Sequence, residues 1–162
     1  MLPMRNLALL CAALAVATFF VGQSIAESAK QMARLGQEAP SFSLQDQNGK
    51  TVSLSDYKGK VVVLEWFNDD CPYVQKHYNS GSMNATAARY EAKGVVWLAV
   101  NSGSAGKEGA GIEATRDGAK TWSMTHPILL DPTGAVGHAY GAKTTPHMFV
   151  IDGKGTLVYK GA

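Results

Sequence analysis

The stretch Val61-Val62-Val63-Leu64-Glu65-Trp66-Phe67-Asn68-Asp69-Asp70-Cys71-Pro72 decides the fold that we expect for this chain of 162 residues. Its first seven residues form a nearly continuous apolar run, which is typical of a strand buried on both faces at the centre of an α/β sheet. A helix is expected to follow, because Asp70 is a suitable N-cap and Pro72 fits a first helical turn. The stretch therefore predicts a buried strand that leads directly into a helix with Cys71 at its N-terminus.

A cysteine in this position is expected to be reactive. The free N–H groups and the dipole of a helix N-terminus stabilise a thiolate, which lowers the pKa of the thiol. The neighbouring carboxylates of Asp69 and Asp70 act in the opposite direction, because a nearby negative charge disfavours a second one. We expect a modest net decrease in the pKa of Cys71, below the ordinary value of roughly 8.5.

The segments on either side of this stretch complete an α/β domain of ordinary size. Strands alternating with helices imply a parallel core with right-handed crossovers, and a closing hairpin adds antiparallel edge strands. The expected elements are a hairpin around residues 46–49, a helix running from residue 71 towards residue 93 that residues 79–82 can interrupt, a strand at 95–100, a helix at 112–124, a strand at 127–131, helical turns at 135–140, and a hairpin of residues 147–152 and 156–160.

Residues 1–26 are predicted to be a secretory signal peptide rather than part of the domain. Arg5 precedes an apolar run over residues 7–21, and Ser24 and Ala26 supply the small residues of a cleavage site. An uncleaved membrane anchor remains the alternative, although the run is shorter than the roughly 20 residues of a spanning helix. We therefore expect a domain of residues 27–162 that is periplasmic or extracellular, without stable membrane insertion after cleavage.

Cleavage would leave Cys71 as the one cysteine of the mature chain, since Cys11 lies inside the leader. Exported proteins usually hold cysteines in disulfide pairs, so a lone cysteine indicates a reactive thiol or an intermolecular partner; a buried, inert cysteine is the alternative. The formal charge is only +2, and no segment combines lysines and arginines with aromatic residues. This composition argues against nucleic acid as a partner.

Three motifs resemble the thioredoxin-like superfamily, and in particular its peroxiredoxin-like branch of alkyl hydroperoxide reductase and thiol-specific antioxidant type. They are Ala39-Pro40-x-Phe42-x-Leu44-x-Asp46, Cys71-Pro72-Tyr73-Val74 and Thr145-Pro146 before an apolar strand. The resemblance implies a thioredoxin-like fold, with a central mixed sheet flanked by helices and an N-terminal β-hairpin extension. It also implies that Cys71 is catalytic, that the Thr145–Pro146 bond is cis, and that Asn68, Thr145 and Pro146 support the substrate groove.

The sequence departs from the patterns of this superfamily at several positions. Val74 stands where C-x-x-C reductases carry their second cysteine, so the motif cannot form a disulfide of its own. Leu64 and Asn68 replace the proline and the threonine or serine of peroxiredoxins, and Asn68 could still donate a hydrogen bond to a peroxide. The peroxide-activating arginine has no assignable counterpart, Arg89 and Arg116 being candidates only by residue type. The usual closing helix is missing, so we expect a chain truncated at its C-terminus.

Together these features predict an exported thiol oxidoreductase without a cofactor. The Cys71 thiolate would attack a peroxide or a disulfide. An external thiol, a thioredoxin-type reductant or a cysteine on the missing C-terminal tail would release the product. The alternative is a non-enzymatic binding module or a copper-binding protein. We expect no metal site, because the four histidines lack close pairing; Cys71 and His147 are the candidate ligands of the copper alternative. The loop at residues 103–111 lacks the ending of a phosphate loop.

Overall fold

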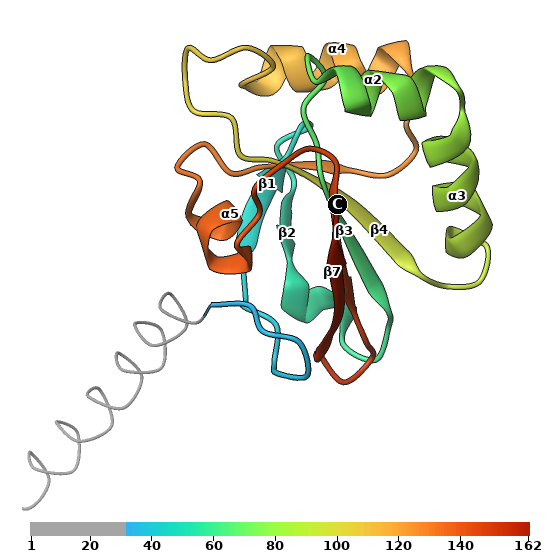
Figure 1. The fold of residues 1–162 in the computed structure, drawn as a ribbon, viewed down its shortest axis with the longest axis vertical. Coiled ribbons are helices and arrows are strands. Elements are labelled where there is room, and N and C mark those ends of the chain that lie inside the picture. The colour runs from blue at the N-terminus through green and yellow to red at the C-terminus, as the bar shows by residue number, and fades with distance from the viewer. Residues whose placement is uncertain (1–31) are drawn as a thin grey trace, which may run out of the picture. The chain divides into compact units, whose positions relative to one another are not determined.

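The computed structural model describes residues 32–162, and the predicted signal peptide, residues 1–26, lies outside them. Within the described part, seven strands form one mixed sheet in the order β2-β1-β5-β4-β3-β6-β7, with helices around it (Figure 1). The elements are β1 (Ser43–Asp46), β2 (Thr51–Ser53), the 3₁₀ helix η1 (Leu54–Tyr57), β3 (Val62–Trp66), α2 (Pro72–Asn79), α3 (Ser82–Glu91), β4 (Val96–Asn101), α4 (Ile112–Thr121), β5 (Ile128–Leu130), α5 (Ala135–Tyr140), β6 (His147–Ile151) and β7 (Leu157–Gly161).

Strand β3 lies inside the sheet, as its apolar sequence predicts. All five of its residues are buried, and it pairs in parallel with β4 and antiparallel with β6. Strands β4 and β5 are also parallel, whereas β1–β2 and β6–β7 are antiparallel hairpins. These pairings confirm the expected parallel core with antiparallel hairpins at the edges.

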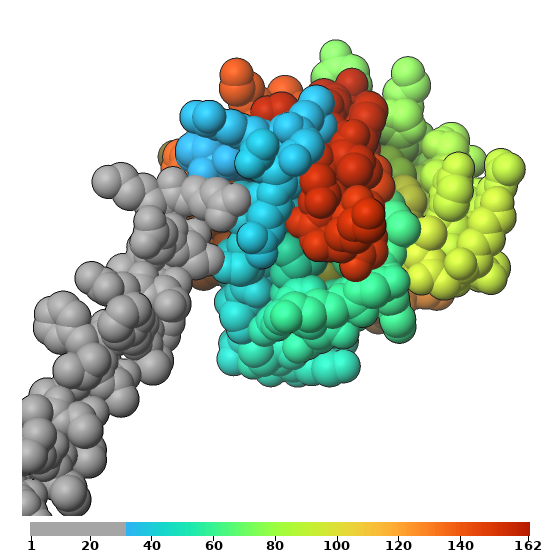
Figure 2. Space-filling model, turned by 90° about the horizontal axis from the view of Figure 1, so that it is seen from below, coloured from blue at the N-terminus to red at the C-terminus, as the bar shows by residue number. Residues whose placement is uncertain are grey.

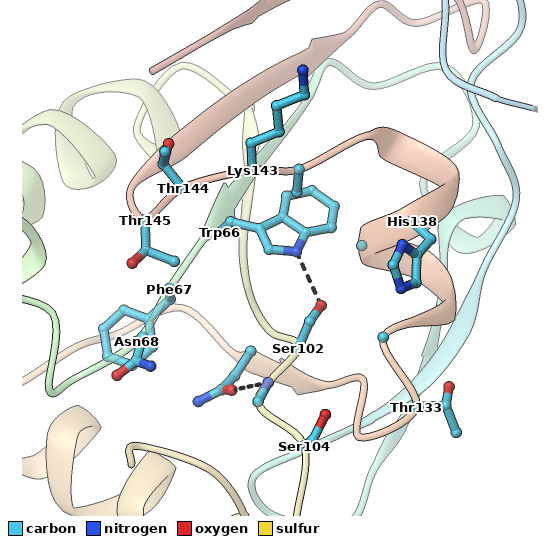
Figure 3. A pocket seen from close by; sticks show the side chains of 15 residues that line it. Trp66, Phe67, Asn68, Ser102, Ser104, Thr133, His138, Lys143, Thr144 and Thr145 are labelled. Atoms are coloured by element: carbon cyan, nitrogen blue, oxygen red, sulfur yellow. Dashed lines mark hydrogen bonds between the residues drawn. The ribbon is translucent and has the colours of Figure 1, made fainter. Parts of the chain in front are cut away.

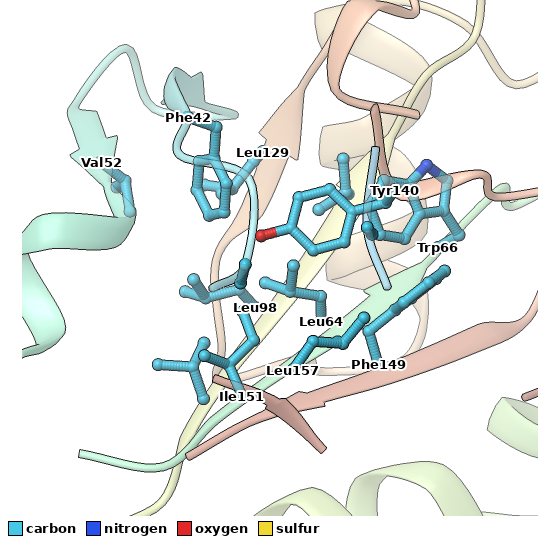
Figure 4. Packing of buried hydrophobic residues seen from close by; sticks show 14 residues of the cluster. Phe42, Val52, Leu64, Trp66, Leu98, Leu129, Tyr140, Phe149, Ile151 and Leu157 are labelled. Carbon is cyan, nitrogen blue, oxygen red and sulfur yellow. The ribbon is translucent and has the colours of Figure 1, made fainter. Parts of the chain in front are cut away.

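Alternate residues of β3 contribute to cores on opposite faces of the sheet. Leu64 and Trp66 belong to a cluster that includes Tyr140 of α5, whereas Val63 packs with Ala87 of α3. Figure 4 shows Tyr140 beside Trp66 and Phe149, with ring centroids 5.4 and 5.5 Å away. Burying rings of this size is a large part of what stabilises such a core. The phenol O–H of Tyr140 is satisfied by the backbone oxygen of Pro40, at 2.7 Å.

The segment before β1 is bound to the closing hairpin. The N–H of Gly36 donates to Leu157 O and the N–H of Leu157 donates to Gln37 O, while Glu38 and Thr156 form an isolated bridge. Figure 2 shows this first described segment, in blue, against the red hairpin. Residues 32–162 contain no helix after β7, and Val158 and Tyr159 of that edge strand are about half exposed.

The helix expected from residue 71 towards residue 93 is two helices. Helix α2 ends at Asn79, and α3 begins at Ser82 after Gly81. Gly81 has a φ of 73°, in the left-handed region that glycine adopts without steric cost, so the break falls within the predicted interruption. The helix expected at residues 112–124 ends earlier, at Thr121. None of the helices in residues 32–162 is long and apolar enough to cross a membrane.

Candidate active site

Cys71 is itself the N-cap of α2, and Pro72 is the first helical residue. The prediction that Asp70 is the N-cap was wrong by one position, and the side chain of Asn68 explains why. Asn68 Oδ1 accepts the N–H of Asp70 at 2.8 Å, and Asn68 O accepts the N–H of Cys71 at 3.1 Å. These bonds form a turn that includes Asp70, so the helix cannot begin until the turn has ended.

The thiol of Cys71 is partly exposed and lies against the Thr145–Pro146 loop. Its S–H donates to Thr145 O at 3.1 Å, and the Thr145–Pro146 bond is cis, as predicted. Burial alone would raise the pKa of the thiol, but the Thr145 side chain and the N–H groups of Val74 and Tyr73 outweigh it. The pKa of Cys71 therefore lies below its ordinary value, in the expected direction, because the Thr145 side chain and the start of α2 both offer donors to the thiolate.

Asp69, two residues before Cys71, is a partly buried carboxyl. Its Oδ1 is buried without a hydrogen-bond partner in the described part of the chain. Burial is the main cause that raises the pKa of Asp69, and the charges of Asp70 and Asp117 add to it. A raised pKa means that Asp69 carries less negative charge at a given pH than an ordinary carboxyl, so it opposes a nearby thiolate less.

A cavity of about 390 Å³ lies at the carboxyl ends of the parallel strands β3 and β4. This is where open α/β sheets commonly bind ligands, and the volume is in the range of small-molecule pockets. Asn68 and Thr145, which both hold Cys71, also line the cavity (Figure 3). Lys143 and His138 are the ionisable side chains of its wall.

Ser102 lines the cavity and belongs to a chain of hydrogen bonds. The indole N–H of Trp66 donates to Ser102 Oγ at 3.0 Å, and Ser102 Oγ donates to Asp131 Oδ2 at 2.7 Å. The N–H of Gly137 donates to the same carboxylate oxygen at 2.9 Å. These bonds satisfy the buried Asp131 and connect β3, β4 and α5 around the cavity, so the wall is a fixed feature of the fold.

The contacts that Arg116, Arg89 and His147 make within residues 32–162 are with residues other than Cys71. Arg116 donates to Gln47 O at 2.8 Å, and Arg89 lies over the Tyr90 ring. His147 Nδ1 accepts the N–H of Lys143 at 3.3 Å, and its ring packs on Phe149, with centroids 4.5 Å apart. Burial is the main cause that lowers the pKa of His147. Among residues 32–162, no three histidine, cysteine, aspartate or glutamate side chains are grouped to hold a metal ion.

A buried polar cluster was not anticipated from the sequence. Glu65 of β3 has no exposed surface, and its Oε2 accepts hydrogen bonds from Trp97 Nε1 at 2.9 Å and Tyr78 Oη at 3.0 Å. Tyr78 Oη also lies 3.3 Å from His126 Nε2. The signal that could have revealed this cluster is the single charged residue within the apolar run of residues 61–67, because a buried carboxyl requires hydrogen-bond donors.

Burial changes the titration of this cluster strongly. It raises the pKa of Glu65 to about 7, although the bonds from Trp97 and Tyr78 favour the carboxylate, and it lowers the pKa of His126 to about 4. Glu65 Oε1 and His126 Nδ1 have no hydrogen-bond partner among residues 32–162. Burial therefore shifts both groups towards their neutral forms in the folded protein.

Val74 lies at the position that would carry the second cysteine of a C-x-x-C motif. It has no exposed surface and packs with Phe67 and Tyr78 in an apolar cluster to which Cys71 is adjacent. Cys71 is the one free thiol of the part of the chain described here. An intramolecular dithiol reaction has no partner in that part.

Residues 35–160 match the AhpC/TSA family. The chain belongs to the AhpC/TSA family. This assignment confirms the thioredoxin-like resemblance in the sequence, and the seven-stranded mixed sheet agrees with it.

Curated relatives of this AhpC/TSA protein are thiol-disulfide oxidoreductases rather than peroxiredoxins. The ResA thiol-disulfide oxidoreductase of Bacillus subtilis (strain 168) is 31% identical over 123 residues, which cover 76% of this chain and 64% of that protein. The ResA protein of Bacillus cereus (strain ATCC 10987 / NRS 248) is 28% identical over 131 residues, covering 81% and 71% of the two chains. Within the thioredoxin-like superfamily, the relatives of this chain are therefore thiol-disulfide oxidoreductases, where the sequence resemblance had indicated the peroxiredoxin-like branch.

Solved structures of other bacterial proteins are similar to this family member in fold. An uncharacterised conserved protein of Geobacillus kaustophilus is similar with a TM-score of 0.73 and 31% identity, covering 81% of this chain and 70% of that one. A putative thiol:disulfide interchange protein DsbE of Chlorobium tepidum is similar with a TM-score of 0.68 and 28% identity, covering 80% and 86%.

Proposed function

We propose that this protein is an exported thiol-disulfide oxidoreductase that reacts through the thiolate of Cys71. One observation carries the proposal: a partly exposed thiol at the N-cap of α2, with a lowered pKa, next to two residues, Asn68 and Thr145, that line a cavity of about 390 Å³. A lowered pKa increases the thiolate fraction at neutral pH, and the thiolate is the attacking species in disulfide exchange. The similarity to thiol-disulfide oxidoreductases supports this chemistry.

The proposed cycle has two exchange steps. The Cys71 thiolate attacks one sulfur of a substrate disulfide, forms a mixed disulfide with that half, and releases the other half as a thiolate, which takes a proton from water. Val74 cannot resolve the mixed disulfide, so an external thiolate attacks it next. That attack forms a disulfide between the external thiol and the substrate half, and Cys71 leaves as a thiolate.

The surroundings of Cys71 suit these steps. Thr145 and Asn68 line the cavity, which can hold the half of a small substrate or reductant that is not attached to Cys71. In the thiol form the S–H is held by Thr145 O, and the N–H groups of Tyr73 and Val74 favour the thiolate once it forms. The predicted signal peptide of residues 1–26 supports a periplasmic or extracellular site of action.

Peroxide is the second oxidant that this thiolate can attack, which would give a Cys71 sulfenic acid and an alcohol or water. The arrangement supports it less. Arg116 of α4 donates to Gln47 O, and Arg89 of α3 lies over the Tyr90 ring. The amide of Asn68, which could have donated to a peroxide, donates to Glu108 O at 3.3 Å. A non-enzymatic binding module would be favoured by a fully buried thiol, whereas Cys71 is partly exposed.

The test compares wild type with Cys71→Ser. With a peptide disulfide as substrate and glutathione as the external thiol, the variant should lose at least about 100-fold in turnover, because a serine hydroxyl is a poor nucleophile. Wild type treated with the peptide disulfide, or with hydrogen peroxide and a sulfenic-acid trap, should show one modification, at Cys71, by mass spectrometry. The expected products are a mixed disulfide, a trapped sulfenic acid or a Cys71–Cys71 dimer.

Adding excess glutathione should then restore the reduced wild-type protein, since exchange requires only access to the sulfur. Cys71→Ser should give none of these species. A wild type that shows no adduct, no dimer and no turnover would exclude Cys71 as a redox centre and would favour the binding module.

A further inference from the structure

A single buried side chain closes the glycine-rich loop that follows β4. Asn101, at the end of β4, is only 3% exposed. Its Nδ2 donates to Gly109 O at 2.7 Å, and its Oδ1 accepts the N–H of Gly103 at 2.8 Å. The two ends of the segment of residues 103–109 are thus held by one amide, and we call this segment the β4 loop.

Glu108 and Gly109, at the C-terminal end of the β4 loop, are in close contact with Asn68, three residues before Cys71. Asn68 Nδ2 donates to Glu108 O at 3.3 Å. A Cβ atom added to Gly109 would overlap Asn68 Oδ1 and would lie 2.6 Å from Asp69 Oδ1, and Gly109 has a φ of 64°. Only glycine provides both this backbone conformation and this close approach without strain.

Asn68 is in turn hydrogen-bonded to the backbone of Asp70 and Cys71. Its Oδ1 accepts the N–H of Asp70 and its backbone oxygen accepts the N–H of Cys71, and these two bonds define the turn before α2. An unbroken series of contacts therefore runs from Asn101 through Gly109 and Asn68 to Cys71, although Asn101 has no direct contact with the thiol among the hydrogen bonds of residues 32–162.

We propose that Asn101 is a positioning residue for Cys71. By closing the β4 loop, it holds Gly109 against Asn68 and so fixes the turn that makes Cys71 the N-cap of α2. The inference deepens the proposed function, since it concerns how the reacting sulfur is oriented.

The physical reason lies in the geometry of the N-cap. A side chain at this position is directed towards the N–H groups of the second and third helical residues, here Tyr73 and Val74. If the β4 loop opens, the Asn68 amide loses Glu108 O and can rotate, and the N–H of Asp70 loses its acceptor. The sulfur then spends less time facing Tyr73 and Val74, and the thiolate is less favoured.

The decisive measurement is the pH dependence of Cys71 alkylation by iodoacetamide, with Asn101→Ala and Gly109→Ala compared with wild type. Asn101→Ala removes both loop contacts, and Gly109→Ala displaces Asn68 from the other end of the series. Neither change alters charge. In both variants the midpoint should move to higher pH, and alkylation at pH 7 should slow by about threefold or more, since the rate follows the thiolate fraction.

Asn84→Ala is the matched control. Asn84 Nδ2 donates to Trp122 O at 2.6 Å, a comparable amide-to-backbone bond on α3. Asn84→Ala should lower the midpoint of thermal unfolding but leave the alkylation midpoint at the wild-type value. If Asn101→Ala and Gly109→Ala behave like Asn84→Ala, the role of Asn101 is structural only and the proposal fails.

Should Asn101→Ala not fold, Asn101→Ser, which also removes the amide that bridges Gly103 and Gly109, decides the question by the same two readouts, and Gly109→Ala tests the loop contact with Asn68. Alkylation needs no disulfide substrate, so this test is independent of turnover. A wild type without disulfide turnover would contradict the proposed function, whereas an unchanged alkylation midpoint in the variants would contradict the positioning role.

Discussion

Glu65 and Cys71 are two weak acids on the same β3–α2 segment, and the fold shifts their pKa values in opposite directions. Glu65 has no exposed surface, and burial raises its pKa to about 7. Cys71 is partly exposed, and the donors around its sulfur lower its pKa in spite of burial. The fold thus shifts Glu65 towards its neutral form and Cys71 towards its ionised form.

The difference comes from burial and from the hydrogen-bond donors that each group can reach. In β3 the backbone N–H groups are committed to pairing with β4 and β6, so among residues 32–162 the carboxylate of Glu65 receives hydrogen bonds only from Trp97 and Tyr78. At the start of α2 the first N–H groups have no partner within the helix and are available to a thiolate. A strand interior therefore disfavours charge, and the helix start that follows it favours an anion.

The largest effect expected from the burial of Glu65 is on how the free energy of unfolding depends on pH. A raised pKa in the folded state means that Glu65 destabilises the protein as pH rises from about 4.5 to about 7. His126, with its pKa lowered from 6.5 to about 4, has the opposite effect, since its stabilising contribution is lost as pH falls through that range. Each contribution is about 3 kcal/mol, at roughly 1.4 kcal/mol per pH unit, so the two nearly cancel.

Glu65→Gln should therefore be more stable relative to wild type at pH 7 than at pH 4.5, by about 3 kcal/mol. His126→Gln should show the reverse difference of similar size. Urea unfolding across this pH range measures both, and comparison with wild type removes the contribution of the other carboxyls. Variants with the same pH dependence as wild type would mean that neither group is buried as described.

A smaller effect is expected from Tyr78→Phe. The change removes the O–H that donates to Glu65 and leaves the carboxyl with Trp97 as its remaining donor. The free energy of unfolding should fall by about 1 to 3 kcal/mol, because a buried acceptor loses a partner. The rate of Cys71 alkylation should not change. Tyr90→Phe on α3, where the ring is 41% exposed, is the control and should be close to neutral; equal losses in the two variants would argue against the cluster.

The smallest effect concerns the Thr145 side chain beside the sulfur. Thr145→Val removes the hydroxyl that favours the thiolate and keeps the backbone oxygen that accepts the S–H. Alkylation of Cys71 at pH 7 should slow by about twofold, with the midpoint moved to higher pH. Thr144→Val, one residue earlier and exposed, should leave the rate unchanged. An identical slowing in both variants would assign the effect to the loop rather than to the hydroxyl.

Most of the fold could be predicted from the sequence, because contiguous patterns control it. The apolar run over residues 61–67 predicted the central strand, and the turn around Asn48-Gly49 predicted the first hairpin. The break near Gly81 was also anticipated. The N-cap was misplaced by one residue, since the Asn68 side chain extends the turn before α2, and helix-start preferences alone do not reveal that competition.

The polar clusters could not be predicted, because their members are distant in the sequence. Glu65 meets Tyr78, Trp97 and His126 only through the order of the strands and the packing of α2 on the sheet. Asn101 reaches the turn of Asn68 only through the β4 loop. Residue types alone do not show which polar groups become partners.

The sequence by itself determined that a buried strand delivers Cys71 to a helix start, and that Val74 leaves the motif without a second thiol. It also determined which segments alternate between strand and helix, since hydrophobic periodicity and turn residues act locally. Only the tertiary structure decided that Glu65 is fully buried while Cys71 is partly exposed next to two cavity-lining residues, Asn68 and Thr145, and how Asn101 connects to the thiol. The reason is that burial and hydrogen-bond donors set a pKa, and distant segments supply both.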